Sequence, residues 1–161
     1  YELPLRLVGS EMCIRDSRCP GWIRQGFDEY AKRMPKEMPL SLTEIAAPKH
    51  HQDSSKINEL EAKKILQKIQ PTDWVVALDE KGRHLSSPAL AGELERWREL
   101  GKDVVFVIGG ANGLASEVLE RANQQLSLSA LTFPHYVVRM LIAETLYRAW
   151  SITIGHPNHR Q

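Results

Sequence analysis

The chain of 161 residues carries 21 Lys and Arg against 20 Asp and Glu, a formal net charge of +1 at pH 7. Its hydrophobic content of 42% and charged content of 25% are ordinary for a globular protein, and the length fits one domain over residues 1–161. No apolar run approaches the roughly 20 residues of a membrane span and no secretory signal is evident, so we expect a cytoplasmic protein. A charge this small does not by itself indicate nucleic acid, and any RNA site must be a local patch or one assembled between subunits.

The first eighteen residues fit the rest of the chain poorly. LPLRLV, residues 3–8, predicts a short strand, but the SEMCIRDSRC that follows has neither strand alternation nor helical spacing. EMCIRDS also reads like a translated transposon-adapter sequence from DNA library preparation. We therefore suspect that residues 1–18 are not native and base no function on them. Cys13 and Cys19, in or beside this segment, form no metal pattern and no disulfide framework.

The next elements follow from periodicity. Residues 21–34 predict an amphipathic helix, because their apolar side chains recur at steps of three and four. Residues 40–45 predict a strand. Residues 48–55 are polar and predict a surface loop. His50 and His51 in that loop have no third ligand at a useful spacing, so we expect no metal site.

Two further helices flank a buried strand. Residues 55–70 have an apolar stripe and a charged opposite side, which indicates a helix closed by the following proline. Residues 74–78 are a continuous apolar run and predict a buried strand, with a turn expected over residues 79–82. A Ser-Pro start and a glycine end indicate another helix over residues 87–101.

Residues 103–135 organise the chain. Residues 104–108 predict a strand covered on both faces, and Gly109, Gly110 and Gly113 then let a ligand approach the backbone closely. We expect Ser116 to cap the next helix and residues 126–133 to return as a strand that Pro134 ends. Two strand ends lined by glycine and serine would lie beside each other and form a pocket.

The glycine turn also permits a dinucleotide-binding loop, since it follows a strand and opens a helix. Its order is G-G-x-x-G, without G-x-G-x-x-G, and residues 122–135 hold no Asp or Glu for a ribose hydroxyl. A nucleotide-binding oxidoreductase is therefore disfavoured. A glycine turn that only joins buried elements also remains open.

The last predicted helix, residues 136–154, is apolar nearly all round, so we expect it to be buried on more than one side. Its spare face indicates a symmetric homodimer. Glu144 and Arg148 stand at i and i+4, as either a structural ion pair or part of a ligand site. The alternation of strands and helices along the chain predicts an α/β domain with a mostly parallel sheet flanked by helices.

Several separated motifs resemble one family. IGGANGL, LSLSALTFPH, VVRMLIAETLYRAWSI and the closing GHPNHRQ, in this order, are similar to the RlmH family. That family belongs to the SPOUT class of S-adenosylmethionine-dependent RNA methyltransferases. The resemblance extends back through WVVALDEKGRHLSSPALAGELERW to GWIRQGFDEYAKRMP, and so covers nearly all of residues 21–160.

The resemblance implies a single SPOUT-type domain with a C-terminal trefoil knot, in which S-adenosylmethionine binds and no metal is required. The donor-binding residues it implies here are Leu78, Gly109, Leu128, Ser129, Ala130, Leu131, Thr132 and Phe133. Leucine side chains and backbone amides suit an adenine ring, and glycine suits close approach. That these leucines are simply core remains the alternative.

The reaction implied is methylation of N3 of a pseudouridine in 23S rRNA, on the large subunit or the assembled 70S ribosome. N3 carries a proton, so a group must remove it or stabilise the anion. We expect His159, Arg160, Glu144 and Arg148 to be the catalytic residues, with His135 and His156 as further candidates. The family commonly ends in a Tyr-His-Arg-like tail, and Asn158 here removes the tyrosine. A non-catalytic ribosome-binding dimer is the remaining alternative.

Overall fold

The computed structural model describes residues 2–10, 21–46, 53–109 and 113–155. Within them strands and helices alternate, as the sequence predicts. The elements are β1 (Leu5–Ser10), α2 (Gly21–Arg33), β2 (Leu40–Ile45), α3 (Ser54–Gln67), β3 (Trp74–His84), α4 (Ser87–Leu100), β4 (Val104–Ile108), α5 (Ser116–Arg121), β5 (Gln124–Ser127) and α6 (His135–Thr153).

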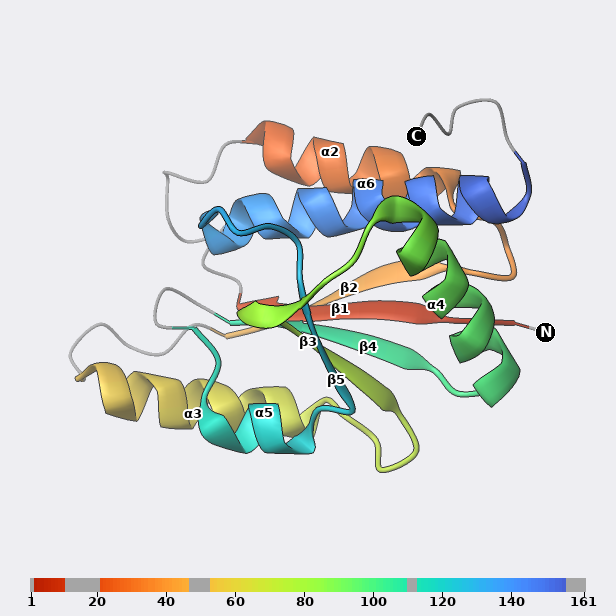
Figure 1. Cartoon of the computed structure of the whole chain (residues 1–161). Helices are drawn as coiled ribbons and strands as arrows, with labels where there is room; N and C mark the ends of the chain where they lie inside the picture. The colour runs from red at the N-terminus through yellow and green to blue at the C-terminus, as the bar shows by residue number, and fades with distance from the viewer. Residues whose placement is uncertain (1, 11–20, 47–52, 110–112, 156–161) are drawn as a thin grey trace.

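The strands form one sheet in the order β2-β1-β4-β3-β5, and each neighbouring pair is parallel. Helices α2, α4 and α6 cover one face of this sheet and α3 and α5 the other (Figure 1). Strand β4 shows why both faces are apolar. Its Phe106 belongs to the apolar core between the sheet and helices α2, α4 and α6. Its neighbours Val105 and Val107 belong to the apolar core on the other face, beneath α3 and α5. The predicted α/β architecture is confirmed.

Strand β1 lies inside the sheet, paired with β2 on one side and β4 on the other. The strand expected over residues 3–8 is therefore confirmed. Leu5, Leu7 and Val8 are fully or almost fully buried, and packing of this kind indicates that the residues before Ser10 belong to the fold. Residues 11–20, with both cysteines, lie outside the described part, as do His50 and His51, and our suspicion about residues 11–18 stays a prediction.

The turn expected over residues 79–82 is wrong, because β3 runs on to His84. Leu126 pairs with both Leu78 and Arg83, so the residues between them leave the ladder and return to it. Gly82 of β3 packs directly against the neighbouring strand β5. A Cβ added to Gly82 would stand 2.7 Å from backbone atoms of Leu126. This excursion brings acidic side chains to the carboxyl end of the sheet.

The strand expected over residues 126–133 is also wrong in its bounds, since β5 ends at Ser127. Two serine hydroxyls compete with the ladder there. The Ser127 hydroxyl donates to the carbonyl oxygen of Ser129 at 2.8 Å, and the Ser129 hydroxyl accepts from the amide of Leu131 at 3.0 Å. The chain therefore turns out of the sheet before it enters α6.

Helix starts differ slightly from expectation. Ser116 is the first residue of α5 and Ala115 holds the cap position without a side-chain hydrogen bond, so the predicted cap at Ser116 is wrong. Ser86 caps α4 by accepting from the amide of Ala89. In the ranges that the structure describes, no helix is long and apolar enough to cross a membrane.

Candidate functional site

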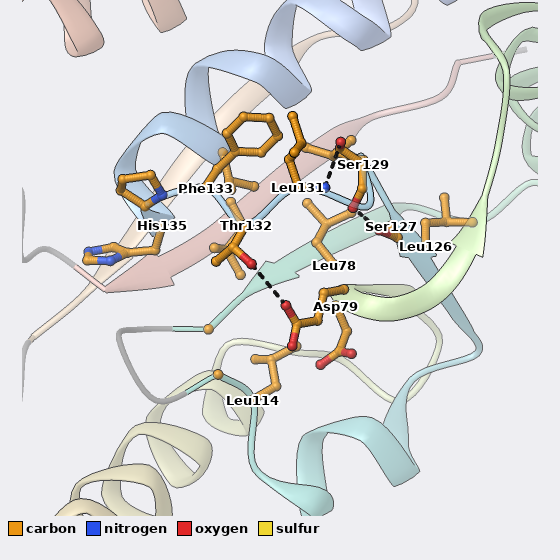
Figure 2. A pocket seen from close by; sticks show the side chains of 17 residues that line it. Leu78, Asp79, Leu114, Leu126, Ser127, Ser129, Leu131, Thr132, Phe133 and His135 are labelled. Atoms are coloured by element: carbon orange, nitrogen blue, oxygen red, sulfur yellow. Dashed lines mark hydrogen bonds between the residues drawn. The ribbon is translucent and has the colours of Figure 1, made fainter.

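A cavity of about 790 Å³ opens at the carboxyl ends of β3, β4 and β5. Adjacent parallel strands bring three connecting segments together at this edge, which is the usual ligand-binding edge of such a sheet. The lining residues are Leu78, Asp79 and Glu80 of β3; Ile108 at the end of β4 with Gly109, Gly113 and Leu114 beyond it; and Leu126, Ser127, Leu128, Ser129, Leu131, Thr132, Phe133, Pro134, His135 and Val138 from β5 into α6 (Figure 2).

The structure brings together nearly all the residues expected to bind a donor. Leu78, Gly109, Leu128, Ser129, Leu131, Thr132 and Phe133 line the cavity. Ala130 does not, because the hydrogen bond from Leu131 to Ser129 makes a turn whose apex it occupies. It is exposed to solvent.

One wall of the cavity offers apolar surface that nothing covers. Leu131 lines the cavity and is 70% exposed, whereas Leu78, which also lines it, is buried. Phe133 lies on the same segment as Leu131 (Figure 2). Exposed apolar side chains at the mouth of a cavity suit a flat aromatic ligand that they would cover on binding.

Glycine is required at position 109 by contact with the loop that follows it. A Cβ there would stand 2.8 Å from the amide nitrogen of Leu114, and closer still to the backbone of Gly113. Gly113 itself has a φ of +75°, which favours glycine. At this wall of the cavity the backbone of Gly109 therefore packs directly against the backbone of Gly113 and Leu114.

The only fixed charges among the described lining residues are the carboxylates of Asp79 and Glu80. Asp79 accepts a hydrogen bond of 2.9 Å from the amide of Lys81, and Glu80 accepts one of 3.4 Å from the hydroxyl of Thr132. The second bond joins the wall that β3 supplies to the wall that follows β5 (Figure 2). The sequence did not single out these acids as site residues, although their position directly after the buried apolar run of residues 74–78 was a signal.

His135 begins α6 and lines the cavity. Burial of its ring, and secondarily the positive charge of Arg139 one turn later, lower the pKa of the imidazole below its ordinary value. Its Nε2 is buried and has no hydrogen-bond partner among the residues that the structure describes. Near neutral pH this residue is an uncharged imidazole beside the cavity, able to accept a proton.

The predicted ion pair of Glu144 and Arg148 is present, with Arg148 Nε 2.9 Å from Glu144 Oε1. Neither residue lines the cavity. Glu144 follows Val138, the last lining residue of α6, by six positions, which in a helix is roughly 9 Å along the axis, so the pair lies beyond the cavity of its own chain. His156, Asn158, His159 and Arg160 lie outside the described residues. In the described ranges no group of side chains could hold a metal ion.

Comparison with known proteins gives a consistent result. A family model described as "Predicted SPOUT methyltransferase" matches residues 12–159. Ribosomal RNA large subunit methyltransferase H of Hahella chejuensis (strain KCTC 2396) is 49% identical over 146 residues, which cover 89% of this chain and 94% of that protein. Among solved structures, ribosomal RNA small subunit methyltransferase E of Neisseria gonorrhoeae bound to S-adenosyl methionine covers 91% of this chain and 67% of its own, at 10% identity and a TM-score of 0.45. That structural likeness is too distant to carry an argument.

Proposed function

Because the chain belongs to the SPOUT methyltransferase family, we propose that it transfers the methyl group of S-adenosylmethionine to N3 of a pseudouridine in 23S rRNA. The observation that carries this proposal is the cavity at the carboxyl edge of the sheet. Its lining includes Leu78, Gly109 and Leu128, which the motifs indicate as donor-binding residues. The rRNA substrate is supported by the name of the relative that shares 49% of its residues with this chain.

The charge of the cavity favours this donor over a dinucleotide. S-adenosylmethionine carries a positive sulfonium, whereas the pyrophosphate of NAD is negative. The described lining holds Asp79 and Glu80 and no lysine or arginine, so a pyrophosphate would meet two carboxylates without a compensating cation. Together with the family membership, this argues against the nucleotide-binding oxidoreductase.

Methyl transfer is an in-line displacement in which the N3 electron pair forms the new N–C bond and the S–C electron pair returns to sulfur. The protein must hold the base in line and take the N3 proton. Among the candidates that the structure describes, only His135 lines the cavity. We therefore propose that His135 is the general base that takes the N3 proton. Its lowered pKa keeps the imidazole neutral and able to accept that proton.

The outward face of α6 supports a homodimer. Val137 and Leu141 are partly exposed and belong to neither apolar core, and Glu144 and Arg148 continue their stripe along the helix. We propose that this stripe packs against the same stripe of a second copy. An RNA site shared between two chains also reconciles a net charge of +1 with a polyanionic substrate.

The length of α6 indicates which chain the tail serves. Val138 lines the cavity, and the 19-residue helix continues past it to Thr153. From Val138 to Gly155 the helix rises roughly 25 Å, whereas the four residues from Gly155 to His159 span at most about 14 Å when extended. We therefore propose that His159 and Arg160 act at the partner's cavity, in a dimer whose two α6 helices run in opposite directions.

Three further expectations complete the proposal. The resemblance implies a trefoil knot, which the meeting of β3 residues with the segments after β4 and β5 at one cavity supports. The substrate is placed in the large subunit or the assembled 70S ribosome, and the protein in the cytoplasm with it. The donor reaction needs no metal, since the leaving group is already a sulfonium.

Ribosomes from a strain that lacks this methylation provide the decisive test. Incubation with the protein and labelled S-adenosylmethionine should place one methyl group on N3 of a 23S rRNA pseudouridine. Calorimetry should show binding of S-adenosylmethionine and none of NAD. Donor binding without methylation would instead indicate the non-catalytic ribosome-binding dimer.

A further inference from the structure

We propose that Asp79 and Glu80 make the cavity selective for the positive charge of the donor, so that the reaction itself loosens its product. The inference rests on the proposed function, because it assumes that S-adenosylmethionine occupies the cavity. Transfer converts the sulfonium into the neutral thioether of S-adenosylhomocysteine, while the N3 proton leaves with the base. The cavity therefore loses one positive charge from its ligand and keeps both carboxylates.

Both carboxylates accept hydrogen bonds in the structure before any ligand binds. Asp79 is held by the amide of Lys81 at 2.9 Å, and Glu80 by the hydroxyl of Thr132 at 3.4 Å. The part of β3 that carries them contacts β5 at Gly82. A side chain at this position would have no room against the Leu126 backbone. Prearranged charges of this kind act on a ligand without reorganising.

No cation of the described lining opposes them. His135 is the only other titratable side chain there. Arg139, the residue after the lining Val138, is almost fully buried, and its Nη1 lies 3.6 Å from Glu44 Oε1. An added positive charge in the cavity is thus attracted without competition from a resident one.

The expected preference is moderate, because Asp79 is half-buried and Glu80 is exposed. For unit charges separated by several ångströms near a solvated surface, each carboxylate contributes roughly a two- to fivefold preference. Together they should favour the sulfonium over the thioether by about tenfold. The preference should shrink in high salt.

The test is calorimetry with S-adenosylmethionine, S-adenosylhomocysteine and sinefungin, a donor analogue with an amine-bearing carbon in place of the sulfonium. The variants are Asp79→Asn and Glu80→Gln, which keep the acceptor oxygens that Lys81 and Thr132 use. Each should lower the ratio of donor to product affinity two- to fivefold, and the double variant should bring it near one. Sinefungin should follow the donor.

Glu99→Gln is the matched control, because Glu99 is an exposed acid of α4 that does not line the cavity. It should leave the ratio unchanged. An unchanged ratio in the double variant, with donor still bound, would overturn the charge selectivity and leave the proposed function standing. Absence of donor binding by the unmodified chain would overturn the proposed function itself.

Discussion

Gly113 lies so close to Gly109 that a Cβ atom at position 109 would stand 2.5 Å from the Gly113 carbonyl carbon and 2.6 Å from its oxygen. Real Cβ atoms do not approach backbone atoms to this distance. A side chain at position 109 must therefore push Gly113 and Leu114 away, and both of these residues line the cavity. The contact links a glycine of the sequence motif directly to the shape of the donor site.

Gly109→Val should reduce affinity for S-adenosylmethionine by at least about tenfold, because displacing a wall of the site costs more than one ordinary contact. The fold should survive, since the displaced loop follows β4 and leaves the core strands in place. Calorimetry measures the affinity and circular dichroism the fold. Gly92→Val is the control, because a Cβ at Gly92 meets nothing within 4 Å. Unchanged affinity in folded Gly109→Val would place the donor elsewhere.

His135 makes methylation dependent on pH. Its pKa is lowered in the folded protein, so the imidazole is neutral at pH 7 and is lost as a proton acceptor only when the pH falls through that lowered pKa. The rate should therefore be flat near neutrality and drop on the acid side. His135→Gln should lower the rate by roughly 100-fold, the contribution of one positioned acid–base group, and abolish the acid-side drop.

The free energy of unfolding should also decrease on the acid side, because the pKa of His135 is lowered in the folded protein. A histidine whose pKa is lowered on folding stabilises the native state above its unfolded pKa and destabilises it as the pH falls below that value. His84→Gln serves as the control for both measurements, since His84 is exposed and does not line the cavity. A His135→Gln enzyme that keeps the wild-type rate and profile would move the proton to another group.

Removal of residues 158–161, which include Arg160, should cut ribosome methylation by at least ~100-fold, the scale of one positioned group that stabilises the developing anion. Donor affinity and melting temperature should change little, because the cavity lining and both cores lie in other segments. Single-turnover methylation and calorimetry measure the two effects separately. Parallel loss of donor binding would mean that the tail is structural.

Co-expression of the truncated chain with Gly109→Val tests whether the tail serves the partner. In a mixed dimer, one site would combine an intact cavity with the tail of the other chain. If the tail acts between chains, mixing should restore roughly a quarter of wild-type activity, because half the random dimers carry one complete site. If the tail serves its own chain, no complete site forms and activity stays at the level of the separate variants.

Leu141→Asp should convert the proposed dimer into a monomer. A carboxylate at Leu141, in the stripe of α6 proposed to form the interface, would be buried there without a partner, which costs several kcal/mol. Sedimentation velocity measures the association state. Leu100→Asp introduces the same charge at a leucine that is 42% exposed on α4, and should leave association unchanged. An active monomer of the unmodified chain at assay concentration would rule out a site shared between two chains.

Gln124 should carry a measurable part of the fold's stability. Its Oε1 accepts hydrogen bonds of 2.7 Å from the indole N–H groups of both Trp74 and Trp97. Gln124→Leu would leave the fully buried Trp97 donor unsatisfied and should cost about 1–3 kcal/mol. Urea unfolding measures this loss. Gln125→Leu, at the exposed neighbouring position, should change the free energy of unfolding by no more than about 0.5 kcal/mol.

Local patterns determined much of this protein. The apolar run Val104–Ile108 and the helical stripes on either side of it specified strands, helices and their order, and hence a parallel sheet covered on both faces. The Glu144 and Arg148 pair was predictable for the same reason, because residues four apart on a helix are neighbours. The glycine turn and the segment before α6 marked most of the cavity, since both follow directly on strands.

Only the tertiary structure decided what these elements meet. Asp79 and Glu80 resembled an ordinary turn, and they face a cavity because β3 leaves and rejoins the ladder around Leu126, a partner more than forty positions away. The serine hydroxyls that end β5 early outweighed strand propensity only where the ladder had no further partner to offer. The charge of His135 depends on burial and on Arg139, and the separation of Glu144 from the cavity depends on where α6 begins. Periodicity reports which side of an element is buried, but which side chains share a cavity depends on contacts between segments distant in sequence, and local pattern carries no record of these.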